Sequence, residues 1–83
     1  MANEELVEIV RQGRKAVAAW RRKNPEVVLD LGDADLSEVD LAGVNLRRCQ
    51  MVGAKLGRAR LTGANFSGVD LTRADLAGAE VSR

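Results

Sequence analysis

The sequence predicts an all-β solenoid of short stacked coils, capped by one N-terminal α-helix. Three features predict this fold: a large apolar residue at every fifth position from Leu31 onward, a small apolar residue two places before each, and a helical segment ahead of the repeats. A helix repeats its buried face about every 3.6 residues and a flat strand about every 2. A period of five therefore requires a different regular structure, in which each unit forms one short side and one corner.

The segment before the repeats reads as a single helix over residues 3–23. Asn3 can accept hydrogen bonds from the first free amides, while Asn24 tolerates a left-handed exit and Pro25 cannot continue the helix. One apolar stripe is expected to cover the first coil, with Trp20 filling the top of the core; it consists of Leu6, Ile9, Val10, Gly13, Val17 and Trp20. We assign residues 1–29 to this cap and its connecting segment, and residues 30–83 to the repeats.

The repeats align in columns that indicate which side chains face inward. The large column should form the core: Leu31, Leu36, Leu41, Leu46, Met51, Leu56, Leu61 and Phe66, continued by Leu71, Leu76 and Val81. The position before each large residue is always polar and should face outward, as in a short extended segment. Two places after each large residue stands a glycine or a long polar residue. We expect type II corners at the glycines and type I corners elsewhere.

The repeat units themselves resemble a known family. The runs Ala34-Asp35-Leu36, Ala64-Asn65-Phe66 and Ala74-Asp75-Leu76 are similar to the consensus of the pentapeptide-repeat family, over about two thirds of the chain. The segment Trp20-Arg21, Asn24-Pro25 and Asp30-Leu31 resembles an N-terminal cap found in bacterial members. The resemblance implies a right-handed quadrilateral β-helix with four units per coil, and therefore under three coils here. Residues 20 apart would then stack on one another.

That stacking would alternate opposite charges from coil to coil. Two columns illustrate it, Asp35 with Lys55 and Asp75, and Asp40 with Arg60 and Glu80. Favourable neighbouring pairs on one face of a sheet contribute roughly 0.2 to 1 kcal/mol each. We therefore expect the charges to set the register of the coils and the inward apolar residues to supply most of the stability.

Composition argues against several classes of function. Thirteen basic and twelve acidic residues give a net charge of +1, which does not favour a nucleic-acid partner. One cysteine and no histidine leave no disulfide framework and no cysteine/histidine zinc site. No basic leader or long apolar run indicates export or membrane insertion, so we expect a cytoplasmic protein.

Individual polar residues do not form a recognisable site. Asp30, Asp33 and Asp35 lack the spacing of a calcium loop, and the acids of the last coil lack a nucleophile or a base beside them. We therefore predict no catalytic residue, no metal and no cofactor. Cys49 falls in the inward small column and is expected to be a packing residue; a reactive thiol is the alternative, because Arg47 and Arg48 lie nearby in sequence.

The two ends of the predicted stack differ, and this difference leads to the functional hypotheses. A helix covers the first coil, whereas Leu71, Leu76 and Val81 are expected to lie on a last coil without cover, so either a partner covers it or the chain once continued. The resemblance implies dimerisation through C-terminal ends. The leading hypothesis is a non-catalytic structural or protein-interaction module, with a homodimer as the first candidate assembly.

Two alternatives come from different classes. The family resemblance also implies mimicry of duplex DNA to bind DNA gyrase or a related topoisomerase, but residues 30–83 carry eight acids and seven bases, whereas mimicry needs a long acidic rod. The other alternative is the recognition domain of a larger bacterial effector or signalling protein.

Overall fold

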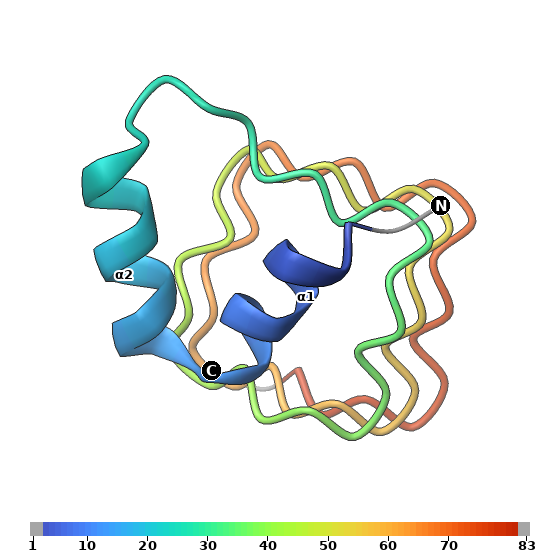
Figure 1. The fold of residues 1–83 in the computed structure, drawn as a ribbon. Helices are drawn as coiled ribbons and strands as arrows, with labels where there is room; N and C mark the ends of the chain where they lie inside the picture. Colours follow the sequence, from blue (N-terminus) through green and yellow to red (C-terminus); the bar gives the residue numbers. More distant parts are fainter. Residues whose placement is uncertain (1–2, 82–83) are drawn as a thin grey trace.

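The repeat segment winds into stacked coils with a period of 20 residues. The computed structural model describes residues 3–81. Parallel bridges join residues 20 apart at seven places: Asp30 to Gln50, Asp35 to Lys55, Asp40 to Arg60, Asn45 to Asn65, Gln50 to Asp70, Lys55 to Asp75 and Arg60 to Glu80. Figure 1 shows these coils lying one behind another, with both helices at the amino-terminal end. Four five-residue units thus complete one turn.

Main-chain hydrogen bonds hold each coil to the next. The Leu31 N–H donates to the Gln50 carbonyl at 2.7 Å, and the Gln50 N–H donates back to the Leu29 carbonyl at 3.0 Å. The same exchange recurs along the sides of the coils, but each pairing is a single bridge, and residues 3–81 contain no longer strand. The predicted fold class is therefore confirmed in part. Parallel pairing occurs between residues 20 apart, as expected, whereas residues 3–81 contain no extended strands and no sheet.

The corners differ from the prediction in one respect. Besides five glycines with φ between 71° and 73°, five non-glycine corner residues also have positive φ, between 59° and 64°: Asp33, Glu38, Arg48, Arg58 and Arg73. The expected type I geometry at these residues is wrong. In the first two coils, hydrogen bonding of the corner amide explains the positive φ. The Asp33 N–H donates to the Val52 carbonyl, just as the Gly43 N–H donates to the Thr62 carbonyl. This bond requires the same backbone orientation at each corner, and it offsets a left-handed cost of roughly 1 to 2 kcal/mol.

The core runs along the inside of the coils. In the large column, residues from Leu31 to Leu56 are 0% exposed and Leu61 is 3% exposed, while Phe66 is partly buried. The small column fills the space between them, with Ala34, Val44, Ala54 and Ala59 also at 0%. Burying each large aliphatic side chain contributes roughly 1.5 to 3 kcal/mol, so this column is the main source of stability.

Two helices, not one, precede the coils: α1 (Glu4–Arg11) and α2 (Arg14–Lys23). The predicted single helix is wrong because Gly13, which had been placed in its apolar stripe, adopts φ 97° and ψ −168° and interrupts the helix. Only glycine readily adopts this conformation. In Figure 1, α1 lies over the interior of the coils, whereas α2 lies along one side.

The break changes which cap residues reach the core. Val10 and Val17 are fully buried. Val7 is also buried, at 4% exposed, although it does not belong to the apolar stripe that was predicted for a single helix. Leu6 and Trp20 are partly buried and pack against the core. Trp20 also lines a groove between the helices with Ile9 and Ala16, so valines, and not this ring, fill the amino-terminal end of the core.

The helix ends are fixed by asparagines, one as predicted and one differently. The Asn3 side chain accepts hydrogen bonds from the Glu5 and Leu6 amides, at 3.0 and 3.3 Å, and so caps α1. Asn24 was expected in a left-handed conformation but has φ −131°. Its amide group instead donates to the Trp20 carbonyl at 2.9 Å, which satisfies the end of α2 through the side chain.

We predict that Gly13→Ala destabilises the protein by about 1 to 3 kcal/mol, the usual cost of a non-glycine residue in this backbone region. No atom lies within 4 Å of the added methyl group, so the cost is conformational and not steric. Urea unfolding measures it. Gly57→Ala is the matched control, because Gly57 has no positive φ and its added methyl group would make only an ordinary contact with the Ala77 carbonyl at 3.6 Å. Equal midpoints for the two variants would contradict this account of the break.

Candidate interaction surfaces

The polar column on the outside of the coils has a local structural role. At seven positions an aspartate or asparagine oxygen accepts a hydrogen bond from the amide two residues later, at 3.0 to 3.1 Å: Asp30, Asp35, Asp40, Asn45, Asn65, Asp70 and Asp75. Each bond satisfies an amide at the corner that follows. Two of the aspartates that were considered for a calcium loop, Asp30 and Asp35, therefore accept hydrogen bonds at the corners that follow them.

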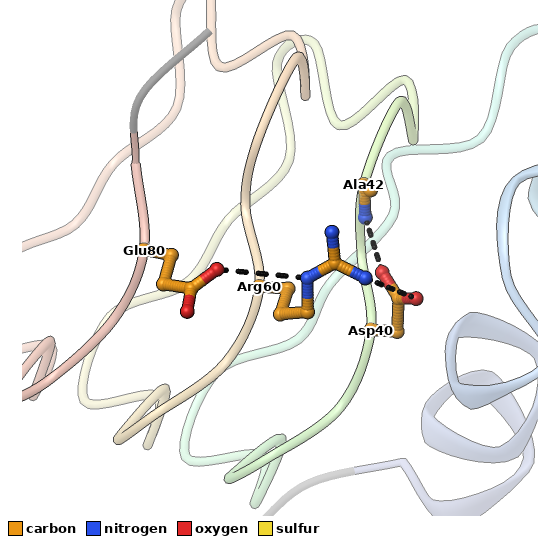
Figure 2. A network of polar contacts seen from close by, with 4 residues as sticks. All are labelled: Asp40, Ala42, Arg60 and Glu80. Carbon is orange, nitrogen blue, oxygen red and sulfur yellow. Dashed lines mark hydrogen bonds and ion pairs between the residues drawn. The ribbon is translucent and has the colours of Figure 1, made fainter.

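At three sides of the middle coil a longer side chain replaces the aspartate or asparagine, and two of the three carry a positive charge. These residues are Gln50, Lys55 and Arg60, which lie between the shorter polar residues of the neighbouring coils. Figure 2 shows Arg60 reaching Asp40 on one side and Glu80 on the other, at 3.2 and 3.6 Å. These side chains are more than half exposed, so each pair contributes at most about 1 kcal/mol. These ion pairs therefore add little to the stability of the stack.

Two outer carboxyls have lowered pKa values. The Thr72 hydroxyl and the Thr72 amide, which donate to Asp70 Oδ1 at 2.6 and 3.0 Å, hold the pKa of Asp70 below its usual range. Ser37 does the same for the pKa of Asp35 through its hydroxyl and its amide, with smaller help from the charges of Lys55 and Arg11. Both groups are fully exposed, so these shifts reflect corner geometry and do not indicate a buried catalytic acid.

The amino-terminal edge of the stack is closed by side chains. In later coils, the equivalent carbonyls accept hydrogen bonds from amides of the preceding coil. Within residues 3–81, the first coil has no preceding coil to supply these amides. Arg11 donates to the Asp35 carbonyl at 2.8 Å, and Arg21 donates to the Arg47 carbonyl at 2.6 Å. The equivalent carbonyls one coil later, Lys55 and Ser67, accept from main-chain amides. Arginine side chains from α1 and α2 thus take the place of the missing coil.

The opposite edge has no such cover within residues 3–81. In earlier coils, the amides at these positions donate to carbonyls of the next coil. Six equivalent amides of the last coil donate to no main-chain carbonyl: Phe66, Gly68, Leu71, Arg73, Leu76 and Gly78. The candidate interface residues lie on this coil. Leu71 is partly buried, Leu76 is 38% exposed and Val81 is 65% exposed. This "carboxyl edge", formed by residues 66–81, combines apolar side chains with unpaired amides.

Cys49 lies inside the stack, where the residue is only 1% exposed and its thiol forms no disulfide. Burial raises the pKa of the Cys49 thiol, and a hydrogen bond and the charge of Arg21 oppose this only in part. Arg21 Nη1 lies 3.6 Å from Cys49 Sγ. A buried thiol with a raised pKa is a poor nucleophile, which favours the packing role over the reactive one.

Other kinds of site were also sought in the described residues. No group of three or more histidine, cysteine, aspartate or glutamate side chains is placed to hold a metal ion within residues 3–81. In the same range, neither helix has the length and hydropathy of a membrane span. The corner expected at Arg83 lies outside the described residues.

Comparison with family models identifies the repeats. The model described as pentapeptide repeats matches eight copies, over residues 30–68 and 49–83. The chain belongs to the pentapeptide-repeat family. A search of curated proteins and a search of solved structures each gave no match. The family match agrees with the five-residue columns of the core and with the aspartate or asparagine that precedes seven of the corners.

Sequence reasoning missed the residues that close the amino-terminal edge. The sequence places Arg11 and Arg21 outside the apolar stripe and indicates no contact with the repeats, yet both donate to carbonyls of the first coil. Helical spacing does not reveal such contacts, because the partners are 24 and 26 residues away in sequence. The corner hydrogen bonds could have been found, since aspartate or asparagine two residues before a turn amide is a known local pattern.

We predict that Thr72→Val raises the pKa of Asp70, because it removes the hydroxyl donor and keeps the shape. Titration of the Asp70 carboxyl carbon by NMR measures the change. Thr72→Ser, which retains the hydroxyl, should keep the low pKa, and equal pKa values in the two variants would contradict the assigned cause. Since the folded pKa lies below the unfolded one, the associated stability is present above the unfolded pKa and is lost as the pH falls through the folded value.

Proposed function

We propose that this chain is a non-catalytic structural module that binds proteins, and that it self-associates through the carboxyl edge. In this proposal residues 30–83 form a short right-handed quadrilateral β-helix, which acts as a rigid support in a bacterial cytoplasm. The family match supports the non-catalytic part of the proposal, since such repeats are generally non-catalytic. The observation that carries the rest is the contrast between the covered amino-terminal edge and the carboxyl edge.

The chemistry of the carboxyl edge favours a protein partner. Exposed strand edges pair readily with other chains, because their amides and carbonyls are already aligned. Here the amides of Leu71 and Leu76 lie beside their own apolar side chains, so a partner could satisfy the amides and bury the side chains together. A second copy of the chain offers the same combination, and a two-fold arrangement closes the assembly at two subunits.

Charge gives this proposal a definite salt dependence. The last coil carries Asp70, Asp75 and Glu80, with Arg73 as a base among its described residues. When two copies meet at this coil, their acidic side chains repel one another. Salt screens this repulsion, because the charged groups are exposed. The association should therefore depend on apolar contact and should persist, or strengthen, at high salt.

Mimicry of duplex DNA is a weaker proposal. It requires a continuous acidic surface, whereas the middle coil presents Lys55 and Arg60 between acidic neighbours. The ion pair of Arg60 with Asp40 and Glu80 further reduces the negative potential of that column.

We predict that the native chain has the mass of a dimer by light scattering over a tenfold range of concentration, at both low and high salt. Leu76→Lys should give a monomer, because it places a charge at the centre of the proposed contact. Ala77→Lys is the matched control: it adds the same charge at an exposed corner of the same coil and should leave the dimer intact. Circular dichroism checks that each variant folds.

A native chain that remains monomeric at every concentration would refute self-association. A dimer that survives Leu76→Lys would refute the proposed surface, even if self-association itself occurs.

A further inference from the structure

A second surface lies at the opposite end of the molecule, where the chain leaves α2 and meets the first coil. Two grooves of about 390 and 260 Å³ adjoin there. They share Arg21, Pro25, Val27 and Arg47 in their linings, so the two grooves are direct neighbours. We call the two together the exit groove and define it by Arg21, Arg22, Val27, Val28, Arg47 and Arg48.

The exit groove has a strong excess of positive charge. Four arginines line it, against a single carboxylate, Glu26. Within residues 3–81, none of the four arginines forms an ion pair, in contrast to Arg58 and Arg60 on the coils. Arg21 is held in place by its bonds to the Arg47 carbonyl and Cys49 Sγ. Arg22, Arg47 and Arg48 are exposed, and their guanidinium groups remain available to an anion.

The same surface exposes apolar side chains. Val27 is 55% and Val28 54% exposed, and both line the exit groove. With Leu76 and Val81 of the carboxyl edge, they are the exposed large apolar residues of the described chain. An inorganic anion would engage the arginines and leave these valines in water. A ligand that uses the whole surface must carry both carboxylates and apolar groups.

We propose that the exit groove binds an acidic peptide segment of a partner protein. Its carboxylates pair with Arg22, Arg47 and Arg48, and its apolar side chains cover Val27 and Val28. The charge complementarity selects a peptide rich in glutamate or aspartate, and the valines distinguish it from a simple polyanion. This site is independent of the carboxyl edge, so a partner can bind here whether or not the chain self-associates.

Fluorescence anisotropy with a labelled peptide of Glu-Glu-Leu repeats tests the proposal. We expect saturable binding to the native chain, and weaker binding at higher salt. Arg22→Ala combined with Arg47→Ala should weaken it by about tenfold, the effect of losing a few charge-assisted contacts. Lys15→Ala combined with Arg73→Ala is the matched control: it removes the same net charge outside the groove and should leave the affinity unchanged.

A second pair of measurements tests the apolar part. Val27→Ser combined with Val28→Ser should weaken binding of the Glu-Glu-Leu peptide but not of polyglutamate of equal length. Thermal melts establish that all variants fold.

Three results would overturn the proposal: no saturable peptide binding, an equal loss in the matched control pair, or polyglutamate and tripolyphosphate binding as tightly as the Glu-Glu-Leu peptide. Binding to phosphatidylglycerol vesicles that needs the same arginines, without peptide binding, would also overturn it and assign the surface to anionic lipid.

Discussion

The parallel exchange of main-chain hydrogen bonds between coils is the constraint on which the rest of the structure depends. Each coil offers amides such as that of Leu31 to carbonyls 19 residues later, and it receives bonds such as that from Gln50 to Leu29. This exchange fixes 20 residues per turn, so residues 20 apart stack on one another and every fifth residue takes an equivalent place on the next side of the coil. The inward columns must then be apolar, and every corner must present its backbone in the same orientation, even where the residue is not glycine.

A ladder of this kind has two ends, and each end must be satisfied by other means. At the amino-terminal end, the helices bury the first coil with Val7, Val10 and Val17, while Arg11 and Arg21 donate to its carbonyls. At the carboxyl edge the unpaired groups include amides, which need acceptors, and the apolar column reaches the surface at Leu76 and Val81. The two proposals rest on this difference: self-association is proposed for the carboxyl edge, and peptide binding for the exit groove beside the closed amino-terminal edge.

The five-residue period was enough to predict the buried columns of the first two coils, but the same columns reach the surface on the last coil, at Leu76 and Val81. The corners at Asp33 and Arg48 were not predictable from residue preference, since the ladder overrides the local cost of positive φ. Gly13 was misread for a related reason: its spacing fits a helical stripe, and only the path of the chain over the first coil requires a break there. The exit groove was not predictable either, because it joins Arg22 to Arg47 and Arg48 across distant parts of the sequence.

The measurement that tests the ladder most directly is NMR detection of scalar couplings across its hydrogen bonds. The account predicts couplings from the Leu31 and Leu56 amides to the carbonyl carbons of Gln50 and Asp75, whose oxygens accept at 2.7 Å. The same offset of 19 residues should recur at the Asp33 amide, which bonds to Val52. Couplings from these three amides to carbonyls at any other offset, or couplings confined to the two helices, would contradict it.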